Sequence, residues 1–404
     1  MKILYFGTVC HLQNYENMMA HSKEKASIAT IVFESSLLSG LKQNGVEADV
    51  YSFPMIPAFP KTKHLYWGNK KESLNCGYNC TWLRTFNIPV IKQLSRRLDG
   101  RRILKKWLKA NKGQECAVLS YSMPPFLTED IVKLSRKYGV KCIAIVTDLL
   151  RDMYINSKNS GFVMFLKNRY LSRALKWQGE FDGYVYLTEA MKDVINPEKP
   201  YTVMEGIADI ATVNTAERIE KASPAAVMYA GMVEEKFGII NLLDAFEAAS
   251  LGDTELWIFG VGNGVEKVKA RADVNPKIRY FGHKKREEIL AAEKKAALLV
   301  NPRNGDDEYT KYSFPSKTVE YMLSATPVLT TKLKGIPDEY YDYLFSCDDN
   351  SVPSLQQALE QAMSTSEEER AAMGIRARHF IAEEKNAAKQ AERIVGFAME
   401  VIKR

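Results

Sequence analysis

Short apolar runs alternate with stretches of helical periodicity along the first half of the chain. The runs are bounded by Gly, Asn, Asp or Ser and predict strands at residues 2–6, 47–53, 117–120, 141–147, 183–187 and 201–204. Between them, apolar residues recur every three or four positions and predict helices at 26–43, 128–138, 165–177 and 189–195. This alternation is typical of a parallel sheet covered by helices. Residues 54–87 have no stable period and are predicted to be a mobile, aromatic-rich excursion.

The second half of the chain repeats the alternation after a polar, non-periodic segment, 209–223, which we interpret as a linker. Strands are predicted at 225–230, 255–259, 278–281, 296–300, 328–331 and 345–347, and helices at 239–250, 287–295 and 354–363. The tail carries an apolar stripe at helical spacing, formed by Ile381, Ala388, Ala391, Ile394, Val395, Ala398, Val401 and Ile402. We therefore expect two doubly wound domains, 1–207 and 208–380, and a C-terminal helix, 381–404, that packs back on the first domain.

Composition agrees with a soluble two-domain protein. The chain has 404 residues, 46% of them hydrophobic, and a mean hydropathy of −0.26. No apolar run reaches the roughly 18 residues of a membrane-spanning helix. Residues 1–7 read directly as a strand, without the apolar region and cleavage site of a signal peptide. These features predict a cytoplasmic protein.

Basic charge is concentrated in one segment, residues 60–113. This segment holds fourteen Lys and Arg against two acids, a net charge of +12, so the rest of a chain with net charge +7 carries −5. Apolar residues at helical spacing, among them Leu94, Leu98, Leu104, Trp107 and Leu108, give the basic residues an amphipathic frame. The favoured partner of this segment is an anionic membrane surface. We therefore expect the protein to attach peripherally to the inner face of the plasma membrane. A surface helix with extended Lys and Arg side chains is the alternative, and no nucleic-acid-binding module is recognisable.

Two familiar cofactor patterns are incomplete in this sequence. Cys76 and Cys80 are the only close cysteine pair, and no second pair of Cys or His lies nearby, so no metal site is predicted. Gly260, Gly262 and Gly264 form half of a dinucleotide-binding fingerprint after a predicted strand. The next strand, 278–281, does not end in the acidic residue that would bind the ribose of NAD or FAD. We expect neither a metal nor a redox cofactor.

Residues 301–331 are the stretch around which we expect the chain to be organised. They run from the end of a predicted strand, through a polar loop, into a helix. Pro315 suits the first turn of that helix, and Ser313 or Ser316 can cap its free amides. Lys317 adds a positive charge where the helix dipole favours an anion, which suggests a phosphate supplied from outside. Glu320 lies one turn further on, where its carboxylate can accept hydrogen bonds from two ribose hydroxyls. A capped surface helix with solvated side chains is the alternative.

The first domain offers two candidate positions at predicted strand ends, where open α/β sheets bind ligands. Gly7 ends the first strand and is a candidate for close approach to a ligand, although a simple turn requires glycine equally well. Asp148 ends the strand at 141–147 and is a candidate catalytic or acceptor-binding carboxylate, with helix capping as the alternative.

These motifs resemble those of glycosyltransferase family 4, a retaining group with the GT-B architecture. The sequence FPSKTVEYMLSATPVL, residues 314–329, resembles the donor motif of bacterial exopolysaccharide and capsule enzymes, and YAGMVEEKFGIINLLDAF, residues 229–246, resembles their phosphate-binding turn. The resemblance covers most of residues 225–349. It implies two Rossmann-like domains facing a central cleft, with a C-terminal helix that crosses back to the first domain.

The resemblance assigns donor-site roles to individual residues. Lys236 matches the basic residue that reaches the donor diphosphate, and Glu320 matches the second glutamate of a paired motif, which holds the ribose. The other assigned donor-site residues are Gly7, Gly231, Gly262, Arg303, Tyr312, Ser316, Lys317 and Thr318.

The sequence departs from the family pattern at three positions. Met232 stands where the family has an Arg, and Tyr312 stands where it has the first glutamate of the pair. Glu308 or Asp307 can approach the sugar instead, and we take Glu308 as a catalytic candidate beside Asp148. The acceptor-side histidine of the family is absent from the strand end at Asp148.

The resemblance implies a metal-independent transfer of a sugar from a nucleoside diphosphate sugar to a glycan or lipid-linked hydroxyl, with retention, in bacterial surface polysaccharide biosynthesis. Two alternatives stay open. One is a nucleotide-sugar epimerase on the same fold. The other is a non-catalytic partner of a transferase that binds a nucleotide sugar or a glycan.

Overall fold

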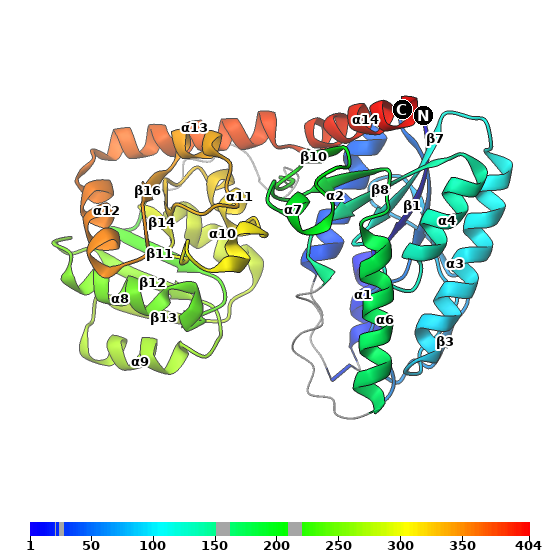
Figure 1. The fold of residues 1–404 in the computed structure, drawn as a ribbon. Coiled ribbons are helices and arrows are strands. Elements are labelled where there is room, and N and C mark those ends of the chain that lie inside the picture. Colours follow the sequence, from blue (N-terminus) through cyan, green and yellow to red (C-terminus); the bar gives the residue numbers. More distant parts are fainter. Residues whose placement is uncertain (21, 24–27, 151–161, 209–219) are drawn as a thin grey trace. The chain divides into compact units, whose positions relative to one another are not determined.

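The computed structural model describes residues 1–20, 22–23, 28–150, 162–208 and 220–404. These residues form two compact units (Figure 1). The first unit is Met1–Ile207 together with Ala387–Arg404, and the second is Ala208–Asn386. Most of the segment that we interpret as a linker lies outside the described residues. Within the described part of the chain, no helix is long and apolar enough to cross a membrane.

The first unit is built on an eight-stranded sheet with the order β10-β9-β8-β7-β1-β2-β5-β4. Its strands are β1 (Lys2–Gly7), β2 (Glu47–Ser52), β4 (Lys71–Ser73), β5 (Asn79–Trp82), β7 (Cys116–Tyr121), β8 (Lys141–Val146), β9 (Gly183–Tyr186) and β10 (Tyr201–Val203). All neighbours are parallel except β4 and β5. The strand order reverses between β1 and β7, which makes their carboxyl ends the switch point of this sheet.

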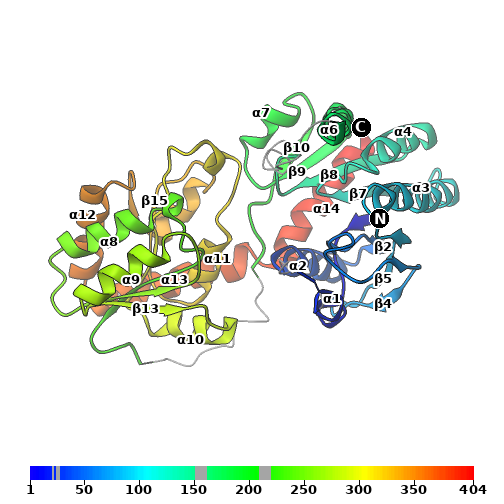
Figure 2. The ribbon, with the colours of Figure 1, turned by 90° about the horizontal axis from the view of Figure 1, so that it is seen from below.

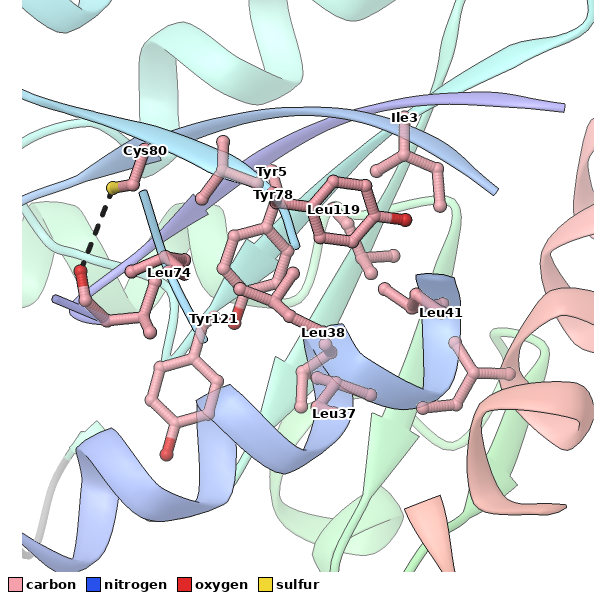
Figure 3. Close-up of a cluster of buried hydrophobic side chains, with 14 of the residues drawn as sticks. Ile3, Tyr5, Leu37, Leu38, Leu41, Leu74, Tyr78, Cys80, Leu119 and Tyr121 are labelled. Atoms are coloured by element: carbon pink, nitrogen blue, oxygen red, sulfur yellow. Dashed lines mark hydrogen bonds between the residues drawn. The ribbon is translucent and has the colours of Figure 1, made fainter. Parts of the chain in front are cut away.

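Helices cover both faces of this sheet. They are α1 (Leu12–Met19), α2 (Ala29–Gln43), α3 (Ile91–Ala110), α4 (Thr128–Tyr138), α6 (Phe162–Gln178), α7 (Met191–Ile195) and α14 (Ala387–Lys403). Figure 2 shows α2 and α14 on one face and α3 and α4 on the other. On the first face, the leucines of α2 point toward Tyr5, Leu119 and Tyr121 of the sheet, and these side chains form one buried cluster (Figure 3).

The expected C-terminal stripe lies in this core, with one difference in its extent. Ala391, Ile394, Ala398 and Val401 of α14 are buried against the first unit. A Cβ atom on Gly40 of α2 would lie 1.9 Å from the carbonyl oxygen of Ala387, so α14 packs directly on the backbone of α2.

Ile381, by contrast, belongs to the preceding helix α13 (Glu367–Glu384) and lies in the core of the second unit. The tail divides at Lys385, whose buried ammonium contacts Glu339 and lies near the rings of Tyr340 and Phe380. These contacts hold Lys385 in the second unit, so the helix that packs on the first unit begins at Ala387 and not at residue 381.

Residues 54–87 are more ordered than their irregular pattern predicts. They supply β4 and β5 to the main sheet and a two-stranded ribbon of β3 (Tyr66–Trp67) and β6 (Thr85–Phe86). Trp67 and Trp82 are buried, with ring centroids 6.3 Å apart. The prediction of a mobile excursion is wrong because these strands are only two to four residues long, too short to show a period of two.

Helix α3 is not the free amphipathic helix that its sequence predicts. Leu104, Trp107 and Leu108 are buried in the protein, whereas Leu94 and Leu98 are exposed. The stripe is therefore divided between the core and the surface.

The arginines of α3 are also occupied within the protein. Arg96 is buried and donates to the carbonyl oxygen of Pro54 and the hydroxyl of Thr85. The other three form ion pairs, Arg97 with Glu129 and Asp130, Arg101 with Asp130, and Arg102 with Asp99. These cations stabilise the first unit, so replacing them would test folding rather than membrane binding.

The second unit has a six-stranded parallel sheet with the order β13-β12-β11-β14-β15-β16. The strands are β11 (Ala226–Ala230), β12 (Glu255–Phe259), β13 (Ile278–Gly282), β14 (Leu298–Asn301), β15 (Val328–Thr331) and β16 (Phe345–Cys347). Its α-helices are α8 (Ile239–Ala248), α9 (Val265–Val274), α10 (Arg286–Lys295), α11 (Ser316–Leu323), α12 (Val352–Ser364) and α13, and its 3-10 turns are η2 (Glu235–Phe237), η3 (Glu308–Lys311) and η4 (Asp338–Tyr343).

Alternate residues of each central strand of the second unit enter different cores. Val227 and Tyr229 of β11 pack with α8, α9 and α12, whereas Met228 and Ala230 pack with α10, α11 and α13. The order reverses between β11 and β14. Ligands of open α/β sheets bind at such a reversal, so the loops after β11 and β14 form the candidate site.

Candidate functional site

The loops that follow β11 and β14 meet at the switch point of the second unit. Gly238, with φ +82°, sits so close to the second loop that a Cβ atom would lie 1.9 Å from the carbonyl oxygen of Pro302. The guanidinium carbon of Arg303 lies 4.8 Å from the centre of the Phe237 ring, and the Tyr309 ring centroid is 6.4 Å from that of Phe237. The first loop therefore supplies a glycine and an aromatic ring, and the second supplies a cation beside them.

Two cations gather at this place. The ammonium of Lys236 lies 5.0 Å from the centre of the Phe237 ring, the same ring that Arg303 contacts. In the part of the chain that the structure describes, neither cation forms an ion pair with an acidic residue, whereas the neighbouring Glu235 pairs with Lys267. Arg303 also opposes the rise in the pKa of Tyr229, which burial brings to about 12. This arrangement suits a bound anion, and it brings together Lys236 and Arg303 as expected.

The glycine-rich turn after β12 has a structural cause. A Cβ atom on Gly262 would lie 2.2 Å from the carbonyl oxygen of Val233. Val233 donates its N–H to Val261 at 2.9 Å, and Gly264 donates to Val233 at 2.8 Å. Glycine at 262 is therefore required by backbone packing between two loops of the same unit, and no ligand is needed to explain it. Gly231 is less restricted, since its nearest neighbour would be the Tyr229 hydroxyl at 3.2 Å.

Helix α11 begins without the cap that its sequence predicts. Pro315 is the N-cap residue, with extended backbone angles, and no side chain of the described residues caps this helix. Thr318 donates its N–H to the Pro315 carbonyl at 2.8 Å. The expectation that Ser313 or Ser316 caps the helix is wrong, because the chain enters the helix one residue later than predicted. The amides of Ser316 and Lys317 precede the first intrahelical bond.

Several buried polar atoms between β14 and α11 lack hydrogen-bond partners among the described residues. They are the Asn301 Nδ2, the Tyr309 hydroxyl, the Ser313 hydroxyl and the Thr318 hydroxyl. Such atoms are rare in folded proteins, so several of them on one segment leave hydrogen-bonding capacity for partners beyond the described residues. Water or a polar ligand can supply these partners.

Lys317 is already neutralised by the protein. Its ammonium contacts the Glu320 carboxylate and lies 3.8 Å from Glu293 Oε1. The guanidinium of Arg286 lies 3.8 Å from Glu320 Oε2. Lys317 therefore does not require an external anion, because the Glu320 carboxylate of its own unit already pairs with it. Glu320 is partly exposed and remains able to accept hydrogen bonds from a ligand.

Tyr312 and Glu308 lie at the two ends of η3. Glu308 is exposed at its first position, and Tyr312 follows its last residue, with its N–H bonded to the Tyr309 carbonyl at 3.0 Å. A 3-10 turn thus occupies the place where the resemblance implies the first glutamate of the pair.

The switch point of the first unit contains a glutamate that sequence reasoning did not single out. Glu34 of α2 is fully buried and accepts hydrogen bonds from the Tyr5 hydroxyl at 2.7 Å, the Thr8 N–H at 2.8 Å and the Thr8 hydroxyl. Burial raises its pKa to about 7. A Cβ atom on Gly7 would lie 1.9 Å from Glu34 Oε2, so this carboxylate explains glycine at position 7 without any ligand.

Asp148 lies at the carboxyl end of β8, as predicted, and is exposed. It accepts a hydrogen bond from the Thr147 hydroxyl at 3.2 Å, and Thr147 is 2.9 Å from the Ser122 hydroxyl. Ser122 and Met123, after β7, have φ angles of +54° and +41°, which are strained for residues with side chains. Strain of this kind is often held at functional sites, so this strand end is a candidate acceptor region.

Comparison with known proteins supports the same architecture. Residues 214–380 match the family model described as glycosyl transferases group 1. No curated protein sequence matches the chain.

Solved structures match over almost the whole chain. A sucrose-phosphate synthase from Thermosynechococcus elongatus aligns with a TM-score of 0.62 and 12% identity, covering 100% of both chains. The lipopolysaccharide outer core galactosyltransferase WaaB aligns with a TM-score of 0.58 and 14% sequence identity, covering 99% of both chains. HepE of Anabaena, in complex with UDP, aligns with a TM-score of 0.57 and 11% sequence identity, covering 98% of this chain and 99% of that one. The chain thus has the GT-B fold, and its second unit carries the match to glycosyl transferases group 1.

Proposed function

We propose that this protein transfers a sugar from a nucleoside diphosphate sugar to a hydroxyl group of a glycan or of a lipid-linked acceptor, with retention of the anomeric configuration. The observation that carries this proposal is the pair of cations, Lys236 and Arg303, beside Phe237 at the switch point of the second unit. A diphosphate matches their charge. The unpartnered polar atoms on residues 301–318 provide hydrogen-bonding positions for the rest of the donor.

The leaving group defines what these residues do. As the glycosidic bond breaks, negative charge develops on the diphosphate, and fixed cations that face it stabilise the transition state. Lys236 and Arg303 take this role, with the free amides of Ser316 and Lys317 as further donors. Glu320 accepts hydrogen bonds from the ribose hydroxyls. These residues act without a metal ion, and no enzyme nucleophile is assigned.

The acceptor side is assigned to the first unit. Asp148, with Thr147 and Ser122 beside it, is the candidate to orient or deprotonate the acceptor hydroxyl. Glu308 is the second catalytic candidate, since an exposed carboxylate on the loop after β14 can approach the donor sugar. Bacterial surface polysaccharide is the proposed product, a choice supported by the motif at 314–329 and by the fold shared with a lipopolysaccharide galactosyltransferase.

We place the protein on the cytoplasmic face of the plasma membrane, held there by an apolar rim on the first unit. The rim consists of exposed side chains on the β3–β6 ribbon, its flanking loops and the start of α3: Phe59, Leu65, Tyr66, Phe86, Ile88, Val90, Ile91, Leu94 and Leu98. Tyr66 and Phe86 are in ring contact at 4.7 Å, and Phe86 donates its N–H to Ser95 of α3. Phe59 donates its N–H to Asn87. These contacts link the β3–β6 ribbon to its flanking loops and to α3.

Two features of the rim favour an anionic bilayer as its partner. Val90 has φ +68° and is 83% exposed, a strained position for a β-branched residue that turns an apolar side chain outward. Lys63, Lys105 and Lys106 are exposed nearby in the chain and have no acidic partner in the described ranges. A segment that carries both exposed apolar side chains and exposed lysines matches the acyl chains and anionic head groups of a membrane surface.

Turnover of purified protein tests the transferase proposal. UDP- and GDP-sugars are supplied singly with candidate glycan and lipid-linked acceptors, and products are identified by mass spectrometry, with the anomeric configuration read by NMR. Transfer by the wild type, lost in Lys236→Ala, is the expected result. Nucleotide binding without transfer to any acceptor would instead favour a non-catalytic partner, a role for which Tyr312 in the place of a glutamate is the specific support.

A further inference from the structure

Behind helix α11, the second unit contains a buried carboxyl group, Glu293, that sequence reasoning did not select. Glu293 lies on α10 and is fully buried. Neither of its carboxylate oxygens accepts a hydrogen bond from a donor group of the described residues, and its side chain lies within hydrogen-bonding reach of Glu320. A buried, ionised carboxylate without hydrogen-bond donors is strongly unfavourable, so this carboxyl group must either be neutral or be paired with a cation.

The charged groups around Glu293 come from both helices. Lys317 of α11 lies 3.8 Å from Glu293 Oε1 but makes its closer contact with Glu320. Arg286 of α10 is 3.8 Å from Glu320 and is 41% exposed. Tyr321 of α11 is buried next to both glutamates, and its hydroxyl is bonded to the backbone of Ala230. Two carboxyl groups therefore share one close ammonium.

A single proton completes this cluster. Two ionised carboxylates cannot donate a hydrogen bond to each other, whereas one protonated carboxyl can donate to the other. Burial is the main reason that the pKa of Glu293 rises to about 8, and the negative charge of Glu320 is the next. Lys317 and Arg286 act in the opposite direction. At neutral pH, Glu293 is therefore the member that holds the proton.

We propose that Glu293 is a positioning residue for the donor site, which in its neutral form donates a hydrogen bond to Glu320 and fixes the carboxylate that receives the ribose hydroxyls. This inference rests on the proposed role of Glu320. Ionised Glu293 would repel Glu320 and compete with it for Lys317. Nucleotide affinity should then decrease as the pH rises through the pKa of Glu293.

Nucleotide affinity measured against pH tests this role. Calorimetric titrations with UDP and GDP are carried out between pH 7 and pH 9 on the wild type, on Glu293→Gln, which imitates the neutral acid, and on Glu287→Gln, an exposed control on the same helix. The wild type and the control should bind about tenfold more weakly at pH 9 than at pH 7, because about a tenth of Glu293 stays protonated one unit above its pKa. Glu293→Gln should bind with nearly constant affinity.

Thermal stability gives a second readout that does not depend on nucleotide. An acid whose pKa is raised in the folded state stabilises the fold below its unfolded pKa, and this stability is lost as the pH rises toward its folded pKa. The melting temperature of the wild type should therefore contain a decrease between about pH 4.5 and pH 8 that Glu293→Gln lacks and Glu287→Gln keeps.

The outcomes separate this inference from the proposed function. Failure of the wild type to bind either nucleotide at pH 7 would count against the proposed function, and the melting profile would then still show whether Glu293 holds a proton. Binding that is independent of pH in the wild type, or equally dependent on pH in Glu293→Gln, would overturn the positioning role.

Discussion

Arg303 and Phe237 come from loops 66 positions apart in the sequence, and the guanidinium of Arg303 lies 4.8 Å from the centre of the Phe237 ring. This contact joins the loop after β11 to the loop after β14 at the reversal of the strand order. It places a cation on a rigid aromatic surface, where less side-chain freedom remains to be lost when an anion binds.

Replacing either cation at this contact should weaken donor binding. Lys236→Ala and Arg303→Ala each remove a charge-assisted contact to phosphate, worth on the order of 1.5 to 3 kcal/mol, so the dissociation constant should rise roughly tenfold or more. Calorimetry with the preferred nucleoside diphosphate measures it. Lys267→Ala, which removes an exposed cation that already pairs with Glu235, is the matched control and should bind like the wild type. Unchanged affinity in both site variants would place the anion site elsewhere.

The ribose role of Glu320 predicts a change in selectivity. Glu320→Gln keeps the size of the side chain but accepts hydrogen bonds from two hydroxyls less well, so it should impair a ribonucleotide more than its 2′-deoxy analogue. Competition binding with the two nucleotides gives the ratio. Equal losses for both nucleotides would mean that Glu320 serves the ion-pair cluster with Lys317 and not the ribose.

The apolar rim predicts binding to anionic vesicles. Ile91, Leu94 and Leu98 are exposed on one face of α3, and burial of each in a bilayer is worth about 1 kcal/mol or more. The triple replacement with Gln should reduce sedimentation with anionic vesicles by at least about tenfold while leaving the melting temperature unchanged. Val274→Gln, an exposed apolar residue on α9, is the control.

Lipid composition and salt complete this test. Binding should be weak to zwitterionic vesicles and should decrease with salt, since each lysine near an anionic surface contributes about 1 kcal/mol that is screened over roughly 8 Å. Salt-independent binding, or equal binding to both kinds of vesicle, would argue for a protein partner at the rim.

Gly7 should be replaceable only with a loss of stability. A Cβ atom there would lie 1.9 Å from Glu34 and 2.5 Å from the Tyr5 ring, so Gly7→Ala should lower the free energy of unfolding by about 1 to 3 kcal/mol. Gly396→Ala, on α14 with no neighbour within 4 Å, should instead raise it by up to about 1 kcal/mol through helix propensity. Urea denaturation measures both. If Gly7→Ala were as stable as the wild type, packing against Glu34 would not explain the glycine, and Gly7 would again be a candidate for contact with a ligand.

The strand–helix alternation predicted the fold well because each element carries its own period. Twelve of the fourteen strands in the two sheets follow directly from such local patterns, the exceptions being the short strands β4 and β5, and so does the apolar stripe of α14. The incorrect predictions concern side chains whose partners are distant in the sequence. Arg97 pairs with Glu129 and Asp130 of α4, and Lys317 lies near Glu293 of α10, and none of these partners can be recognised from the local sequence.

Buried acids were the hardest residues to predict. Glu34 and Glu293 each lie in an amphipathic helix where a carboxylate is normally exposed, and only the fold shows that both face inward. Glu34 lies within the apolar run of α2, and this position in the sequence indicates burial. Glu293 is followed by two lysines and has no comparable signal, because its neighbours on α11 are more than twenty positions away.

The division of the first unit between two segments of the chain has a consequence for synthesis. Strands β1 to β10 leave the ribosome long before α14, whose apolar side chains complete their core beside α2. The second unit is continuous, so it can fold while the first still lacks its final helix. During that interval the face of α2 that receives α14 is open to chaperones and to other nascent chains, and the order of folding is the reverse of the order in which the two units begin.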